Sequence, residues 1–252
     1  MPMRWRAFSL PKKGHVDDEY EDASAGDAER GRFAVADGAS ESSFASLWAG
    51  LLAAEFVRAP LGRKRPWANW LPPLRDRWAQ EIGGRELPWY AEEKLRLGAF
   101  ATLVGLVVGK AHWRAVAIGD SCLFHVRQGR LLHSFPVSRS EEFGNNPRLV
   151  GSRTPAPDAV QQQQVRAHGA WQPNDQFLLM TDALAQWFLQ QVEGGNKPWE
   201  VLDRLLDEPE DNAVFASWID GLRGRGRLRN DDVTLVAVDL NGEARPAGES
   251  TP

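Results

Sequence analysis

Four aspartates stand where hydrophobic segments of the sequence end or begin. Asp and Glu side chains are rarely buried unless they are paired or bind a metal. Carboxylates that lack clustered Cys or His partners suit hard cations such as Mg²⁺ and Mn²⁺. Two such ions about 3.5–4 Å apart can hold a bridging water and lower its pKa, so this pattern favours metal-assisted hydrolysis. The four residues are Asp37, Asp120, Asp182 and Asp231.

Each aspartate taken alone also has an ordinary structural explanation. Asp182 precedes a predicted helix and could be its N-cap, and Asp120-Ser121 could be a turn. A reading in which all four are caps and turns therefore stays open as an alternative. It does not explain why so many strand ends carry Asp, because the preference of Asp for turns is modest.

Short apolar segments predict the strands that position these carboxylates. Segments 32–36, 113–118 and 176–181 each lead into an aspartate, and segment 233–238 follows one directly. The segment 101–108 predicts another strand, and 123–126 and 131–133 predict a hairpin around Gln128-Gly129. Strands so close in sequence must be antiparallel neighbours, because parallel partners need a long crossover.

Helical periodicity separates these groups of strands. Apolar residues recur with a helical period over 42–58, and segments 74–82, 90–100, 183–192, 198–206 and 212–222 are also predicted helices. The segment 59–73 is interpreted as an irregular connection and 138–164 as a long, mobile surface excursion. Helices that alternate with groups of hairpin strands predict an α+β protein with mainly antiparallel sheets and helices packed outside.

Composition restricts the class of protein further. The chain has 252 residues with a net charge of −4, so we expect no nucleic-acid partner, and the basic runs 63–65 and 223–229 are interpreted as solvated loops. The single Cys122 excludes a disulfide within the chain and a Cys-based zinc site. Both Cys122 and the 11 Trp are expected to pack in the core. No segment approaches the ~20 apolar residues of a membrane span, so we expect a cytoplasmic protein with no membrane partner.

The order of the aspartate motifs resembles the type 2C (PPM) metal-dependent serine/threonine protein phosphatases of the bacterial type. The resemblance extends from about Gly14 to Asp239, so a single phosphatase-like domain is expected over 1–240, with a disordered tail at 241–252. Four elements carry it in the family's order. They are Tyr20-Glu21-Asp22-Ala23 followed by Val35-Ala36-Asp37-Gly38, then Gly119-Asp120-Ser121, then Leu178 to Ala183, and finally Asp231-Asp232-Val233-Thr234.

The resemblance implies a fold and a role for each matched residue. The implied fold is a four-layer α-β-β-α sandwich of two mainly antiparallel sheets flanked by helices, with the metals in a cleft at one edge. The implied cofactors are two Mn²⁺ or Mg²⁺ ions, with a third ion at a weaker site. Asp37 bridges the two metals, the Gly38 carbonyl binds one, Asp182 and Asp231 complete the shell of the second, Asp22 holds a metal-bound water with help from Glu21, and Asp120 belongs to the third site.

The implied reaction is hydrolysis of phosphoserine and phosphothreonine in proteins. A metal-activated water attacks phosphorus directly, with Asp22 and Asp37 as the catalytic carboxylates and no phosphoenzyme. The implied partners are a phosphorylated protein substrate and a cognate kinase, and the implied context is signalling.

This sequence departs from the family pattern at three places. The position of the usual phosphate-gripping Arg holds Asp17, so Lys13 and His15 are predicted to bind phosphate, with Lys12 as a further substitute. Gly38 is followed by Ala39-Ser40-Glu41, and Ala183 replaces a Gly whose φ is unfavourable for Ala if positive. These departures leave two alternatives open, namely a phosphatase-like regulatory or binding module with weak or no activity, and a hydrolase of small phosphate esters.

Overall fold

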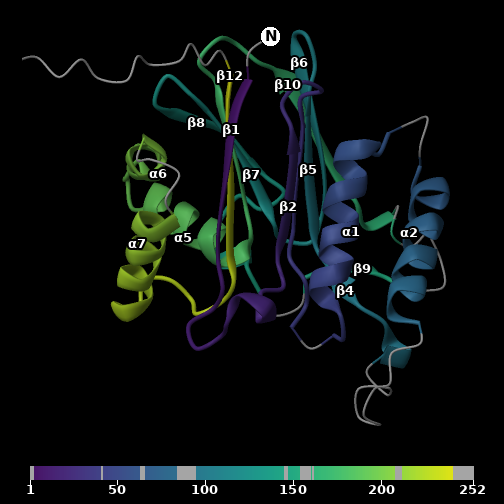
Figure 1. Ribbon diagram of the computed structural model, residues 1–252. Coiled ribbons are helices and arrows are strands. Elements are labelled where there is room, and N and C mark those ends of the chain that lie inside the picture. The colour runs from purple at the N-terminus through teal and green to yellow at the C-terminus, as the bar shows by residue number, and fades with distance from the viewer. Residues whose placement is uncertain are drawn as a thin grey trace, which may run out of the picture.

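Two five-stranded antiparallel sheets face each other in a computed structural model of the chain (Figure 1). The structure describes residues 3–40, 42–62, 66–83, 95–144, 147–153, 160, 162–207 and 212–240. The first sheet has the order β1 (Met3–Leu10), β12 (Val233–Leu240), β11 (Gln176–Met180), β7 (Cys122–Arg127), β8 (Arg130–Phe135). The second has the order β10 (Val165–Ala170), β6 (His112–Ile118), β5 (Leu103–Val108), β3 (Arg32–Ala36), β2 (Ala23–Asp27).

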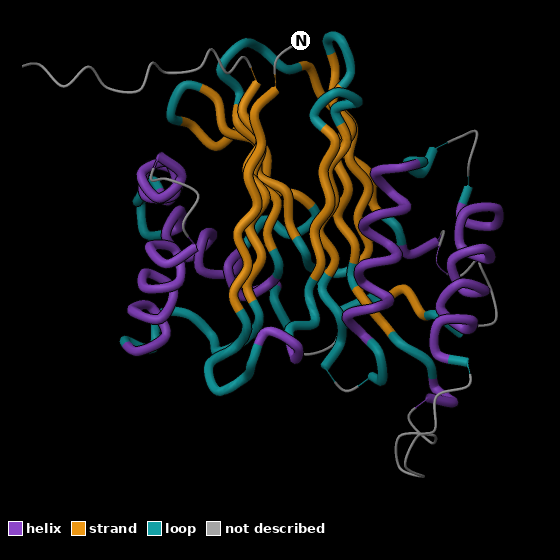
Figure 2. The backbone as a smooth tube through the Cα atoms, in the orientation of Figure 1, coloured by secondary structure: helices purple, strands orange, loops and turns teal. Residues whose placement is uncertain are grey.

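Helices cover the outer face of each sheet, as the layers of Figure 2 show. The first sheet is covered by α5 (Asp182–Glu193), α6 (Pro198–Asp207) and α7 (Asn212–Gly224), and the second by α1 (Ala45–Arg58) and α2 (Trp67–Ile82). The predicted α-β-β-α arrangement of antiparallel sheets is therefore confirmed. None of the described helices combines the length and apolar character that crossing a bilayer requires.

Three apolar layers hold the sandwich together. Alternate residues of each strand enter the layer between the sheets, which includes Phe33, Leu179 and Val236, all fully buried. The opposite faces pack on the helices. Cys122 lies fully buried against α5–α7, and Trp48, Trp67, Trp70, Trp78 and Trp113 are also buried, which confirms the packing roles predicted for Cys122 and for these tryptophans.

The interpretation of segment 59–73 as an irregular connection is wrong in its second half. Helix α2 begins at Trp67 and continues through Pro72 and Pro73. Two prolines inside a helix remove backbone hydrogen bonds, which is why sequence reasoning ends a helix there. The helix persists because its apolar face is fully packed, and because the Trp67 and Trp70 indoles donate to Gln164 Oε1 (3.0 Å) and the Ala59 carbonyl (2.9 Å).

Three edge or near-edge strands escape sequence prediction. Strands β1, β2 and β10 carry polar or exposed residues without a long apolar run, so pairing with a neighbouring strand decides that they form strands.

The excursion 138–164 is not wholly at the surface. Within it the 3₁₀ turn Ser140–Glu142 precedes β9 (Val150–Gly151), which pairs with β4 (Phe100–Ala101) and buries Val150. Residues 90–94 of the predicted helix 90–100 and the predicted tail 241–252 lie outside the described residues, so the domain boundary at 240 stays a prediction. The described part of that helix ends before its predicted end, because Phe100 begins β4.

Candidate metal centre

Three aspartates meet at one edge of the two sheets. Asp37 follows β3, Asp120 lies between β6 and β7, and Asp182 begins α5 directly after β11. One carboxylate oxygen from each lies within 4.8 Å of the others. We call these three residues the acidic cluster. Residues from strands of both sheets thus converge, as the predicted strand ends require.

Burial and mutual repulsion make this cluster costly without a cation. Burial, followed by repulsion from Asp22 and Asp182, raises the pKa of Asp37 well above its ordinary value. Burial and the charge of Asp182 raise the pKa of Asp120 to about 7. The Asp120 Oδ1 atom is buried and accepts no hydrogen bond. An orphaned carboxylate oxygen among three converging aspartates fits a hard divalent cation such as Mn²⁺ or Mg²⁺.

A short hydrogen-bond relay holds Asp37 in place. The Thr102 backbone N–H donates to the Asp37 carbonyl (2.8 Å), and the Asp37 N–H donates to Thr102 Oγ1 (3.3 Å). Thr102 Oγ1 in turn lies 2.6 Å from Ser121 Oγ. Gly119 has φ +92°, and a Cβ there would come within 2.6 Å of Thr102 Cγ2. The Gly-Asp-Ser element therefore supports Asp37 as well as supplying Asp120.

Backbone conformation accounts for two further motif positions. A Cβ on Gly38 would lie 2.6 Å from the Glu21 carbonyl oxygen, so only Gly fits there. Ala183 lies inside α5 and is not among the positive-φ residues, so it replaces the family's Gly without strain. The N-cap of α5 is Thr181, so Asp182 is not the cap. Its position in the first helical turn favours a negative charge.

Arg229 reaches this cluster from the turn before β12. Its Nη2 atom contacts Asp182 Oδ2 and lies 3.4 Å from Asp231 Oδ2. Both Arg229 and Asp231 line a pocket of about 330 Å³ together with Asp37, Gly38 and Asp182. The interpretation of 223–229 as a solvated loop holds for the exposed Arg229 but is wrong at both Leu228, which is buried, and Arg223, which belongs to α7. The Arg223 side chain is 4% exposed and donates to the Pro11 (3.0 Å) and Asp231 (2.6 Å) carbonyls.

Two buried aspartates beside the cluster have different partners. Asp22 Oδ2 accepts a hydrogen bond from Thr234 Oγ1 (2.7 Å), and burial raises its pKa well above the ordinary value. Asp232 accepts from the backbone N–H groups of Lys12 and Glu21, both at 2.8 Å. Asp232 thereby ties the segment that carries Asp22 to β12. Sequence reasoning assigned no role to Asp232, Thr102 or Arg229, because their partners are distant in sequence.

The residues predicted to bind phosphate have other contacts. The Lys13 backbone N–H donates to Asn230 Oδ1 (2.7 Å), and His15 Nδ1 lies 3.4 Å from Glu19 Oε2. Neither is among the described residues that line the pocket. Lys12 comes closer, because its Nζ atom donates to Ser40 Oγ (3.1 Å), and Ser40 lines the pocket. The phosphate-binding roles of Lys13 and His15 stay predictions.

Comparison with known proteins gives a consistent picture. A family model described as protein phosphatase 2C matches residues 12–224. The Mycobacterium tuberculosis serine/threonine phosphatase PstP/Ppp has a similar structure, with 18% identity, a TM-score of 0.61 and coverage of 95% of this chain and 99% of that one. The PstP catalytic domain in complex with two manganese ions is 20% identical and has a TM-score of 0.58, with coverage of 95% of this chain and 99% of that one. PppA, a key regulatory component of T6SS in Pseudomonas aeruginosa, is 20% identical and has a TM-score of 0.53, with coverage of 94% of this chain and 96% of that one. No curated protein matches the sequence.

Proposed function

Because the chain belongs to the protein phosphatase 2C family, we propose that its acidic cluster holds the divalent metal ions used to hydrolyse phosphoserine and phosphothreonine in proteins. The single observation that carries the assignment to these residues is the convergence of Asp37, Asp120 and Asp182 within 4.8 Å. The orphaned Asp120 Oδ1 atom supports it independently.

We assign the ligands as follows. Asp37 and Asp182 would hold the ions from the two sheets, Asp231 would join them from the pocket wall, and the Gly38 carbonyl would be a further ligand. Asp120, predicted to serve only a weaker third ion, belongs to the central cluster in this proposal. When bound, Mn²⁺ or Mg²⁺ supplies charge that stabilises the phosphoryl oxygens and lowers the pKa of a water.

The protein's own groups orient and charge the reacting region. Asp22, fixed by Thr234, is the buried acid placed to accept a proton beside the cluster. Arg229 and Lys12 carry the positive charge at the pocket, and a guanidinium matches a phosphoryl group through two parallel hydrogen bonds. We propose that these two residues replace the family's Arg, whose position holds Asp17.

The test measures hydrolysis of p-nitrophenyl phosphate and of a phosphothreonine peptide, with Mn²⁺ and with a chelator. Asp37→Asn and Asp182→Asn are each expected to reduce turnover by more than about a hundredfold, the usual scale for losing a central electrostatic group. Asp76→Asn, on the exposed face of α2, is the matched control and should leave turnover unchanged.

Different failures separate the alternatives. Bound Mn²⁺ without turnover of either substrate favours the regulatory or binding module. Turnover of the small ester alone favours a small phosphate-ester hydrolase. Lack of any divalent metal binding by the purified protein contradicts the proposed metal centre.

A cytoplasmic location, a signalling role and a cognate kinase, all expected from the sequence, also belong to this proposal. The description of PppA as a regulatory component supports only the signalling role. Phosphoproteome comparison of cells with and without the active protein checks it, because substrates of an opposing kinase should gain phosphate when the protein is absent.

A further inference from the structure

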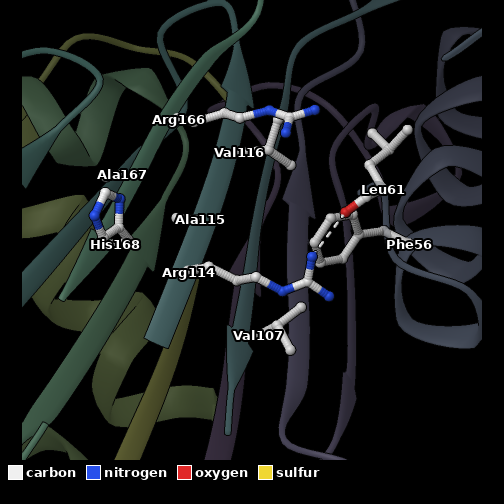
Figure 3. Close-up of a pocket in the computed structure, with 9 residues that line it drawn as sticks. All are labelled: Phe56, Leu61, Val107, Arg114, Ala115, Val116, Arg166, Ala167 and His168. Atoms are coloured by element: carbon white, nitrogen blue, oxygen red, sulfur yellow. Dashed lines mark hydrogen bonds between the residues drawn. The ribbon is translucent and has the colours of Figure 1, made fainter. Parts of the chain in front are cut away.

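A second pocket, of about 200 Å³, lies on the outer face of the second sheet beside the C-terminal end of α1 (Figure 3). Its apolar wall comes from Phe56 in α1, Leu61 in the following segment, and Val107 and Val116 on β5 and β6. Its polar wall comes from Arg114, Arg166 and His168. The pocket therefore combines apolar surface with positive charge.

Strand register brings the two arginines to one face. Strands β6 and β10 are antiparallel neighbours, with Arg166 opposite Val116 and His168 opposite Arg114. Residues two apart on a strand share a face, so Arg114 and Arg166 both project toward the helix layer. In Figure 3 their guanidinium ends extend toward the side of the pocket formed by Phe56 and Leu61, whereas the His168 ring lies apart from them.

Both guanidiniums have uncharged hydrogen-bond partners. Arg114 Nη1 donates to the Leu61 carbonyl at 3.3 Å, and Arg166 donates from Nε and Nη2 to Gln164 Oε1 at 3.3 and 3.2 Å. These bonds are long, and each guanidinium has five N–H donors. Donors therefore remain on both side chains for a ligand.

The charges that act on Arg114 are those of neighbouring arginines. Burial, followed by the charges of Arg166 and Arg32, lowers the pKa of Arg114. Arg32 itself donates to the carbonyls of Val57 and Arg58 at the end of α1. None of the described residues that line the pocket is acidic. The nearby Glu55 accepts two hydrogen bonds from Arg58, both at 2.6 Å.

This pocket is separate from the acidic cluster. Val107, which lines the pocket, pairs with Arg32 at the start of β3. Asp37 follows the last residue of β3, so Arg32 and Asp37 are five residues apart along an extended strand. At about 3.3 Å per residue that is roughly 16 Å. The pocket also lies on the helix-covered face of the sheet. An anion bound here would not contact the metal ligands.

We propose that this pocket binds a small anionic ligand whose phosphoryl head pairs with Arg114 and Arg166 and whose apolar body packs against Phe56, Leu61 and Val107. Two guanidiniums on the same face of the sheet match a doubly charged, tetrahedral head. The volume is below the ~300 Å³ typical of larger ligand pockets, so the apolar body must be short. Such a ligand comes either from a second phosphorylated side chain of a protein substrate or from a free small phosphate ester.

The first experiment titrates the full chain with phenylphosphonate, which carries the charged head and an apolar ring but has no ester bond to hydrolyse. Inorganic phosphate is the probe that lacks the apolar body, and benzyl alcohol is the probe that lacks the charged head. Calorimetry is carried out in chelator, so binding does not depend on metal or on turnover. We expect phenylphosphonate to bind most tightly, and Arg114→Gln and Arg166→Gln each to weaken it at least about tenfold, the scale of a charged hydrogen bond.

Arg130 is an exposed arginine on β8, and Arg130→Gln is the matched control, which should bind phenylphosphonate as the unaltered chain does.

The second experiment measures binding of peptides with one and with two phosphothreonines in chelator. Selective weakening of the doubly phosphorylated peptide by Arg166→Gln identifies a substrate side chain as the source, and an effect confined to phenylphosphonate identifies a free ester. Phenylphosphonate binding that both variants leave unchanged overturns the proposal, whatever the outcome of the hydrolysis assays.

Discussion

The guanidinium of Arg229 contacts the carboxylate of Asp182, a residue 47 positions earlier in the chain. A cation belonging to the protein thus pairs with one of the carboxylates that we assign to the metal ions. Its charge partly offsets the repulsion among the aspartates of the pocket. In the proposed ligand assignment, metal ions would compete with Arg229 for Asp182, and the same guanidinium would be available for a phosphoryl group.

We predict that Arg229→Gln tightens Mn²⁺ binding by up to about fivefold. The variant removes the competing cation, and a partly exposed ion pair contributes at most ~1 kcal/mol. Calorimetric titration of the metal-free protein measures the affinity. Arg227→Gln, an exposed residue of the same loop, is the control and should not change it. Weaker Mn²⁺ binding in Arg229→Gln would show that the guanidinium does not compete with the metal.

Substitution of Asp232 should reduce stability, whereas substitution of the adjacent Asp231 should reduce metal affinity. Asp232 is 5% exposed and accepts two backbone hydrogen bonds that fix the segment around Glu21. We expect Asp232→Ala to lower the free energy of unfolding by about 2–4 kcal/mol, because two partly buried donors lose a charged acceptor. Urea denaturation in chelator measures it.

Asp231→Ala is the matched comparison. Its side chain is 39% exposed and lines the metal pocket. We expect little change in unfolding free energy in chelator, together with a clear loss of Mn²⁺ affinity. Equal destabilisation by the two variants would contradict the distinction between a structural and a ligand aspartate.

The metal-free protein should lose stability as pH rises through the range between about 4 and 7. The pKa of Asp120 is raised from 3.8 to about 7 in the folded chain, chiefly by burial. The folded state therefore binds more protons than the unfolded state in this range, and the free energy of unfolding falls as pH increases. Metal and protons compete for the same oxygens, so Mn²⁺ affinity should rise over the upper part of this range.

Thermal unfolding in chelator between pH 5 and pH 8 measures the effect. Asp120→Asn removes the titrating group, so the difference between variant and unaltered chain isolates its contribution from that of other groups such as His125. We expect the variant to become relatively more stable as pH rises. A difference that does not change with pH would contradict the raised pKa of Asp120.

The far end of β11 provides a stability determinant that is separate from the metal centre. The buried Asp175 carboxylate accepts from Arg127 Nε and Nη2, both at 2.7 Å, from the Gln172 N–H at 2.8 Å, and pairs with His125 Nε2 at 2.8 Å. Burial alone would raise the pKa of Asp175, but these contacts lower it by more than burial raises it, so the net shift is downward. We expect Asp175→Ala to cost about 2–4 kcal/mol, because the donors of Arg127, Gln172 and His125 lose a buried charged acceptor.

Hydrolysis should survive this change. Asp175 and Asp182 are at opposite ends of β11, seven residues apart, or roughly 23 Å of extended chain. Urea denaturation and p-nitrophenyl phosphate hydrolysis below the unfolding transition measure the two quantities. Asp27→Ala breaks the surface pair with Arg30 and should have a much smaller effect on stability. A large loss of turnover in folded Asp175→Ala would contradict the independence of the two ends.

Local patterns in the sequence determined most of the elements and the order of the aspartates. Alternation and short apolar runs predict β3, β6, β7, β11 and β12, because side-chain period follows directly from backbone geometry. The same strand ends predict where Asp37, Asp120 and Asp182 stand. Antiparallel pairing with short connections then brings such ends to a common edge.

Only the tertiary structure decided what depends on contacts between distant segments. Packing of Trp67 and Trp70 carries α2 through Pro72 and Pro73 against local preference, and pairing with β12 makes a strand of β1. Asp120 joins the central cluster, and Arg229 reaches Asp182. Asp232 rather than Asp231 binds the backbone of Lys12 and Glu21, between β1 and β2. Neighbouring residues of the same type take different roles there, because register and burial are set by the sheets and not by residue type.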